Sequence, residues 1–411
     1  MRRSVTEPLD HLLEKYARLV VRIGVNVQPG QEVVITALPE QADTARAIMA
    51  EAYRVGASRV SIDYQDPYVL RQPVLDGPEE MLGVAPDHQL QRVRAWHESK
   101  PAVVNLTGNP FPGLMEGLDP SRLARSQPME VIQEVAPLML NATIAWTVVG
   151  APTQGWAESM GLADVAELWE AVAHAMRLDE ADPEAVWRAH IAKLKRREQI
   201  LNAHAFDRVR YQGPGTDVTI GLMPGSVWRG GSGANEDGVE FVPNMPTEEV
   251  FISPDWRRAE GVVRTTAPFN LMGTIVEDLE LELRDGEIVG AKAAHGEAQV
   301  QAQFEHIPRA RYLGEVAIVD SDSRVADTGL VFKDMLYDEN VGSHIAWGMG
   351  FAFSHEGAME KSPQERIESG LNQSGTHVDI VVGSPEVQID GIHADGSVVP
   401  VTRGDEFVLT D

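Results

Sequence analysis

Acidic and histidine side chains recur in the second half of this 411-residue chain in patterns suited to metal binding. His377 and Asp379 open the β-branched run HVDIVVG, which predicts a strand. Because residues i and i+2 of a strand project from the same face, this imidazole and carboxylate should point together, about 7 Å apart along the strand. The pair fits a metal site, and it fits a structural His–Asp hydrogen bond equally well.

Glu248 and Glu249 raise the same question for carboxylates. Both lie in the strand-like run EEVFI, and as neighbours in a strand they should point to opposite faces. One of them is therefore expected to face the interior, where an unpartnered carboxylate is costly and a cation is a natural partner. The pattern does not say which of the two it is. Two exposed acids on an edge strand would fit it as well.

Two further residues complete the set of candidates. Glu315 stands at the entrance of EVAIV, a predicted buried strand, where a carboxylate often faces a cleft. His344 follows the turn-like YDENVGS and precedes the small-residue stretch IAWGMGFAF, and taken alone it would be expected to be a core histidine. Asp338 and Glu339 lie in that turn. They are candidates only for contacts within the turn or for contacts with the metal ligands, and not for contacts with the metal itself.

The absence of cysteine narrows the chemistry that these residues can perform. Disulfides, thiolate zinc sites, iron–sulfur clusters and a cysteine nucleophile are all excluded. Two glutamates, two histidines and an aspartate, all after residue 240, suit two divalent ions of the zinc, cobalt or manganese type. Such ions lie about 3.5–4 Å apart, with a carboxylate and a water bridging them.

The formal net charge of −27 restricts the partners of the chain. A surface of this sign repels phosphate backbones and anionic membranes, so no nucleic-acid or membrane partner is expected. No run approaches the roughly 18 apolar residues of a membrane span, and the opening residues lack the apolar core of a signal peptide. We therefore predict a cytoplasmic protein whose charge serves mainly its solubility.

Alternating strand and helix patterns predict an α/β domain in the first half of the chain. The helical pattern at 41–57 lies between two strand-like runs, and this βαβ unit implies a parallel sheet. The charged helix expected at 182–206 should connect this domain, residues 1–206, to the next one. Its strands are expected at 32–38, 59–64, 101–108 and 142–150.

Residues 207–411 have a different texture, with short strands separated by turns. Asp285-Gly286 between two alternating runs is a strong hairpin signal. Helical patterns return at GEAQVQAQFEHIP and near 364–373. This half is predicted to be an α+β domain, and it carries all the candidate ligands.

Several motifs, in order along the chain, resemble those of the M29 family of metallo-aminopeptidases, the thermophilic aminopeptidase T group. They are NMPTEEVF, RYLGEVAIVD, DTGLVFKDMLYDENVGSHIAWG and NQSGTHVDIVVG, preceded by YARLVVRIGVNVQPGQEVVITA and SIDYQDP. The resemblance implies a hydrolase that removes N-terminal residues from peptides with two co-catalytic divalent metals. It also implies an N-terminal α/β domain, a C-terminal metal-binding domain and a homodimer that encloses a large cavity.

Carried over by position, the resemblance also implies which residues hold the metals. It selects Glu249 over Glu248 by motif spacing, and it does not single out the general base. Glu248, or another unassigned carboxylate, is then a candidate to move the proton. The implied metal ligands are Glu249, Glu315, His344, His377 and Asp379.

Phe351 departs from the family pattern. The family places a tyrosine seven residues after the histidine of its HxAxG motif, and this count from His344 ends at Phe351. A tyrosine hydroxyl there could donate a hydrogen bond to the oxyanion of a tetrahedral intermediate, whereas phenylalanine cannot. The departure predicts a less efficient peptidase that retains its metal site. His355, four residues further on, is an alternative hydrogen-bond donor to the oxyanion if the chain turns back toward the metal site.

Two rival functions fit parts of the pattern. Some relatives of this fold are mononuclear-iron, ring-cleaving dioxygenases of dihydroxypyridines, which resemble the chain in the His-x-Asp strand and at His344. Two histidines and one carboxylate are the usual iron(II) oxygenase set, but a mononuclear site does not need both Glu249 and Glu315. A non-catalytic protein that holds structural metal would instead have a site closed to water.

Overall fold

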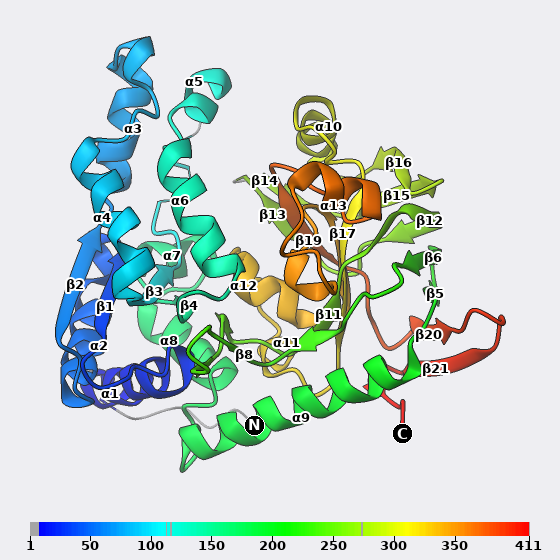
Figure 1. The fold of residues 1–411 in the computed structure, drawn as a ribbon, viewed down its shortest axis with the longest axis horizontal. Coiled ribbons are helices and arrows are strands. Elements are labelled where there is room, and N and C mark those ends of the chain that lie inside the picture. The colour runs from blue at the N-terminus through cyan, green and yellow to red at the C-terminus, as the bar shows by residue number, and fades with distance from the viewer. Residues whose placement is uncertain (1–7, 112, 116, 273, 411) are drawn as a thin grey trace. The chain divides into compact units, whose positions relative to one another are not determined.

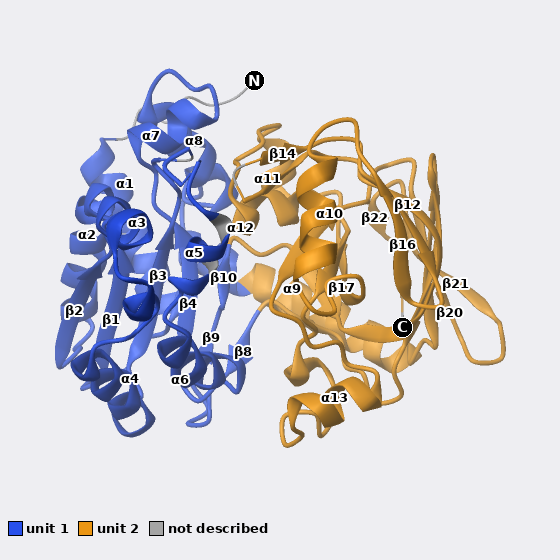
Figure 2. Ribbon diagram, turned by 90° about the horizontal axis from the view of Figure 1, so that it is seen from above, with its two compact units in different colours: residues 1–188, 232–245 blue, residues 189–231, 246–411 orange. Residues whose placement is uncertain are grey.

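The computed structural model describes residues 8–111, 113–115, 117–272 and 274–410. The chain divides into two compact units, residues 1–188 with 232–245 and residues 189–231 with 246–411 (Figure 2). The division falls inside helix α9 (Pro183–His204), whereas the sequence placed a single boundary after residue 206. The segment 232–245 belongs to the first unit because its last two residues extend that unit's sheet.

The first unit contains a five-stranded sheet in the order β10-β4-β3-β1-β2, and every pair of neighbouring strands is parallel (Figure 1, with β10 labelled in Figure 2). The predicted parallel sheet is therefore present. Its strands are β1 (Glu32–Ala37), β2 (Arg59–Tyr64), β3 (Ala102–Thr107), β4 (Trp146–Gly150) and β10 (Asn244–Met245).

Helices of the first unit cover this sheet with apolar side chains. Val34 and Val103, paired on adjacent strands, pack with Trp96 of α4 and Leu138 of α6 in one buried cluster. Tyr16 of α1 is fully buried, and its hydroxyl donates to the carbonyl of Gly150 at 2.5 Å. The helices are α1 (Leu9–Leu19), α2 (Ala42–Arg54), α3 (Pro67–Asp76), α4 (Asp87–Ser99), α5 (Pro120–Arg125), α6 (Met129–Leu140), α7 (Gln154–Ser159) and α8 (Val165–Ala175).

The second unit contains an eight-stranded antiparallel sheet in the order β16-β15-β12-β6-β5-β20-β21-β22. The predicted hairpin is confirmed, because Asp285 and Gly286 join β15 to β16 and both have positive φ, as a type I′ turn requires. The strands are β5 (Arg208–Gly213), β6 (Thr216–Leu222), β12 (Pro254–Arg264), β15 (Glu280–Arg284), β16 (Glu287–Lys292), β20 (Gln388–Ile392), β21 (Val398–Arg403) and β22 (Glu406–Phe407).

A second, five-stranded antiparallel sheet in this unit has the order β19-β18-β17-β11-β7. Its strands are β7 (Arg229–Gly230), β11 (Glu249–Ile252), β17 (Leu313–Val319), β18 (His344–Gly348) and β19 (His377–Val381). One face of this sheet packs into the main hydrophobic core through alternate apolar residues. They are Val250, Ile252, Val316, Ile318, Ile345, Trp347, Val378 and Ile380.

Short elements connect the strands of the second unit. They are β13 (Phe269–Leu271), β14 (Thr274–Val276), α10 (Glu297–His306), α11 (Arg324–Asp327), α12 (Met335–Asp338), α13 (Pro363–Ser369) and the 3-10 turns Glu339–Val341 and Ala352–Ser354. The helical pattern near 364–373 thus corresponds to α13. Among the described residues, no helix is both long and apolar enough to cross a bilayer.

Gly348 closes β18 at a point where only glycine fits. Its φ is +101°, and a Cβ atom there would lie 2.1 Å from the carbonyl oxygen of Thr376. Gly348 pairs with His377, so this close approach sets the position at which β19 begins beside β18. Gly357 also has a positive φ, +71°, but a Cβ there would have no neighbour within 4 Å.

Gly348→Ala and Gly357→Ala are therefore a matched pair for testing this packing. Gly357→Ala should cost about 1 kcal/mol, the ordinary penalty for a side chain in left-handed backbone. Gly348→Ala should cost about 3 kcal/mol or more, because β18 and β19 must also move apart. Urea unfolding of the two variants checks this, and equal losses of stability would contradict the close approach.

Candidate metal centre

The candidate ligands share one face of the five-stranded sheet because of its register. Ala317 pairs with His344, and Ala346 pairs with both Glu315 and Asp379. Residues that pair across an antiparallel sheet share a face, and so do residues two apart on one strand. Ala317 also pairs with Phe251 on β11, and Glu249 lies two residues before Phe251 on the same strand. The face of the sheet opposite the core therefore carries all five candidates, which are Glu249, Glu315, His344, His377 and Asp379.

Small residues separate the ligands on this face. Ala317 and Ala346 occupy the central positions, and both are buried. Their short side chains lie between the longer side chains of the candidate ligands on neighbouring strands. The alternation that packs Ile345 and Trp347 into the core on the other face thus places the candidate ligands on this one.

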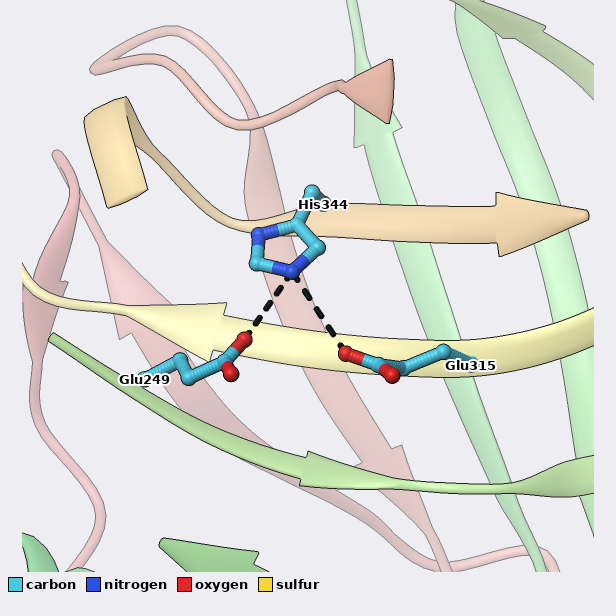
Figure 3. A group of neighbouring side chains, drawn as sticks. All are labelled: Glu249, Glu315 and His344. Atoms are coloured by element: carbon cyan, nitrogen blue, oxygen red, sulfur yellow. Dashed lines mark ion pairs between the residues drawn. The ribbon is translucent and has the colours of Figure 1, made fainter. Parts of the chain in front are cut away.

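Glu315 lies between the two histidines. Its Oε1 is 3.5 Å from His344 Nε2, and its Oε2 is 3.5 Å from His377 Nε2. His344 Nε2 is also 3.0 Å from Glu249 Oε2 (Figure 3), and His377 Nε2 is 3.1 Å from Asp379 Oδ1. The side chains form two groups of possible metal ligands, Glu249/Glu315/His344 and Glu315/His377/Asp379, with ligand atoms within 4.8 Å of one another in each group.

Backbone carbonyls orient both imidazoles. His344 Nδ1 lies 3.1 Å from the carbonyl oxygen of Gly342, and His377 Nδ1 lies 2.8 Å from that of Met349. A carbonyl only accepts hydrogen bonds, so each Nδ1 carries a proton, and a cation that replaces the proton on Nε2 would bind to the Nε2 lone pair. Metal-ligating histidines commonly have this arrangement, in which a hydrogen bond from one nitrogen directs the other toward the ion.

The electrostatics of the cluster fit a bound cation. Glu249, Glu315 and Asp379 are all buried, and Glu249 Oε2 has no hydrogen-bond partner among the described residues although His344 is close to it. Burial raises the pKa of Glu249, against the opposing effect of His344. Burial alone would lower the pKa of His344, but Glu249 and Glu315 raise it well above its ordinary value. Concentrated negative charge of this kind is stable when cations neutralise it.

Glu248 points away from the candidate ligands. Its Oε2 lies 3.3 Å from His190 Nε2 on α9, and its Oε1 accepts a hydrogen bond of 3.4 Å from the amide of Arg324. Its own amide donates to Asn340 Oδ1 at 2.7 Å. As strand parity predicts, Glu248 and Glu249 have different surroundings, and Glu249 is the one that lies with the histidines.

Glu339, for which the sequence predicts only turn contacts or contacts behind the ligands, also lies near the candidate ligands. Burial raises the pKa of its carboxyl well above the usual value, and the nearby charges of Asp379 and Glu249 raise it further. Glu339 and Asp379 line one pocket together with Asn270 and Asp338, whose pKa burial raises to about 7. The only sequence signal for Glu339 was an acid placed five residues before His344.

Phe351 lies against the ligands, and His355 does not. The ring of Phe351 is 4.8 Å from the ring of His377, and its amide donates to Ser253 Oγ at 2.8 Å. His355 Nε2 instead lies 3.1 Å from the carbonyl oxygen of Pro224. The position at which this chain departs from the family pattern is thus adjacent to a candidate ligand, and the alternative donor is directed elsewhere.

Known proteins resemble this chain along its whole length. Residues 9–407 match the family described as thermophilic metalloprotease (M29). Aminopeptidase T from Thermus aquaticus is 38% identical, with 97% of this chain and 98% of that protein matched. Aminopeptidase PepS from Streptococcus thermophilus is 35% identical over the same shares of the two chains.

Solved structures resemble the fold. Wild-type AmpT from Thermus thermophilus has a TM-score of 0.89 at 36% identity, covering 98% of this chain and 100% of that one. The 2,5-dihydroxypyridine dioxygenase of Pseudomonas putida KT2440 has a TM-score of 0.55 at 13% identity, covering 98% of this chain and 99% of that one. At that identity, the second likeness shows a shared fold alone.

The fold is thus that of a family of metal-dependent hydrolases. The chain belongs to the M29 family of thermophilic metalloproteases and is a metallo-aminopeptidase. The resemblance found in the sequence is confirmed, and so is the predicted fold class of an α/β domain followed by an α+β domain.

Glu315→Gln should remove most of the bound divalent metal, because Glu315 faces both histidines and an amide is a weaker, uncharged ligand. We expect at least a tenfold loss of zinc affinity, the loss seen even for residues that only orient ligands. Glu248→Gln is the matched control and should keep its zinc. Metal content after dialysis, measured by mass spectrometry on folded protein, checks both variants, and equal zinc in the two would contradict the shared position of Glu315.

Proposed function

We propose that this metallo-aminopeptidase removes N-terminal residues from peptides with two divalent ions per subunit. The observation that carries the proposal is the position of Glu315, which presents one carboxylate oxygen to each histidine. Two ligand groups that share a carboxylate are what a co-catalytic pair needs, and zinc, cobalt or manganese suits nitrogen and oxygen ligands of this kind. The proposed ligands are Glu249, Glu315, His344, His377 and Asp379.

The bound ions would lower the pKa of a water molecule and polarise the scissile carbonyl. The chain itself would contribute orientation and proton transfer. The hydrogen bonds of His344 and His377 to backbone carbonyls hold both rings so that they do not have to reorganise during the reaction. Water attacks the carbonyl carbon, the C–N bond breaks, and the proton released from the water passes to the departing amine.

We assign the transfer of that proton to Glu339. Burial raises the pKa of its carboxyl, and a carboxyl whose pKa is raised is a stronger base, as a group that takes a proton from water and passes it on must be. It lines a pocket with Asp338 and Asp379, and these carboxylates would also attract the positively charged α-amine of the substrate. Glu248, the candidate named from the sequence, has contacts that favour a structural role, in which it links α9 to the start of β11 through His190.

We also propose that the protein is a homodimer, as the resemblance implies. Large apolar side chains are exposed on α3 and just after it in the first unit, and exposed apolar patches often mark protein interfaces. These side chains are Tyr68, Val69, Leu70, Leu75, Met81 and Val84. A cytoplasmic location remains a proposal that rests on the composition of the chain.

Hydrolysis of leucine p-nitroanilide by protein loaded with zinc, cobalt or manganese tests the proposed mechanism. The wild type should turn over with at least one metal and stop in chelator. Glu339→Gln should keep its metal and lose at least about 100-fold in kcat, the usual contribution of a general acid–base group. Glu248→Gln is its control and should stay within a fewfold of the wild type.

Two outcomes would count against the mechanism. Absence of turnover in folded, metal-loaded wild type would remove the aminopeptidase assignment, and a single bound iron per chain would favour dioxygenase chemistry instead. Loss of kcat in Glu248→Gln, but not in Glu339→Gln, would return the proton-transfer role to Glu248.

Phe351→Tyr should raise kcat severalfold with little change in KM. The new hydroxyl would lie beside His377, where it could donate to the developing oxyanion, an interaction that contributes mainly in the transition state. Phe353→Tyr is the matched control, because this neighbouring ring stacks on Phe351 and is not the position of the family tyrosine. An unchanged or lower kcat in Phe351→Tyr would mean that another group already stabilises the oxyanion.

A further inference from the structure

Three phenylalanine rings form a cluster beside the candidate metal centre. Phe251 and Phe351 have ring centroids 5.8 Å apart, Phe251 and Phe353 are 6.0 Å apart, and Phe351 stacks on Phe353 at 5.3 Å. We call these three residues the aromatic wall. We propose that the aromatic wall receives the side chain of the substrate's N-terminal residue and selects large apolar side chains, an inference that rests on the proposed function.

The aromatic wall is on the catalytic side of the sheet. Phe251 follows Glu249 by two residues on β11 and pairs with Ala317, so its side chain projects from the same face as the ligands. Phe351 contacts the ring of His377. A peptide whose scissile carbonyl lies at the metal centre would therefore have its N-terminal side chain within reach of these rings.

The aromatic wall has apolar surface that the protein leaves partly uncovered. All three rings belong to half-buried residues, whereas Glu249, Val250 and Ile252 on the same strand as Phe251 are buried. Ligand sites are mostly lined by apolar and aromatic side chains with a few polar groups beside them. Partly exposed rings next to a buried polar centre match that description.

Hydrogen bonds hold the backbone of the aromatic wall in place. The carbonyl of Phe351 accepts a hydrogen bond of 2.7 Å from Ser354 Oγ, and its amide donates to Ser253 Oγ. Arg229 Nε donates to the carbonyl oxygen of Phe353 at 3.1 Å. Because the rings are preorganised, an apolar side chain can pack on them without first ordering the site.

The aromatic wall disfavours an acidic side chain. Arg229 pairs with Phe251 across β7 and β11, but its Nε donates to the carbonyl oxygen of Phe353 and its Nη1 lies 4.0 Å from a carboxylate oxygen of Glu198. An acidic side chain would therefore lose its hydration on apolar rings, where the guanidinium of Arg229 already has partners.

The test compares p-nitroanilides of leucine, phenylalanine, alanine and glutamate with the metal-loaded enzyme. The wild type should prefer leucine and phenylalanine over alanine at least tenfold in kcat/KM, as apolar pockets do for a few added carbons, and glutamate should be the poorest substrate. Phe353→Ala and Phe251→Ala should each reduce the leucine-to-alanine ratio in kcat/KM about tenfold. Phe353→Leu, which keeps a large apolar side chain, should have a leucine-to-alanine ratio closer to that of the wild type than to that of Phe353→Ala.

Phe407→Ala is the control variant. Phe407 is also half-buried, but it lies on β22, outside the sheet that carries the candidate ligands, where its ring packs against Arg197 of α9. Its removal should leave the leucine-to-alanine ratio unchanged. If the leucine-to-alanine ratio is unchanged in both Phe353→Ala and Phe251→Ala, each shown to be folded and metal-loaded, the aromatic wall does not select the substrate. The proposed function would not be affected by that result. Absence of hydrolysis of every substrate by the wild type would overturn the proposed function itself.

Discussion

The buried carboxylate of Glu315 is the feature on which the rest of the site depends. It lies on β17, the central strand of the five-stranded sheet, and among the described residues it is the one carboxylate that lies near both His344 and His377. Its position depends on an irregularity in the β17–β18 pairing between Leu313 and Glu315, where Gly314 lets the backbone pass close to the carbonyl oxygen of Met349. Any side chain at Gly314 would shift β17 and separate the two ligand groups.

Strand alternation makes this buried acidic centre compatible with a stable fold. Every second residue of β17, β18 and β19 belongs to the hydrophobic core, and burying such side chains contributes about 1.5–3 kcal/mol each. The intervening residues can then carry carboxylates whose burial is unfavourable until cations neutralise them. The core face therefore stabilises the geometry that the polar face requires.

The local parts of the site were predictable from the sequence, and the parts made by pairing were not. Period-two alternation placed His377 beside Asp379 and separated Glu249 from Glu248, because strand parity depends only on neighbouring residues. Which strands lie side by side depends on long-range pairing, so Phe251 and Phe353 were missed and Glu339 was expected only in a turn or behind the ligands. The return of 232–245 to the first unit was missed for a similar reason, since a two-residue strand such as β10 has no periodicity to detect.

Phe351 connects the chemistry of the centre to its apolar surroundings. A tyrosine there would offer a hydrogen-bond donor to the reacting carbonyl, whereas phenylalanine offers only its ring, which stacks on Phe353 and is tilted against His377. Apolar rings that exclude water lower the local dielectric, and every charge interaction in the centre then becomes stronger. Part of the stabilisation lost with the hydroxyl would then return through the charged groups of the candidate metal centre.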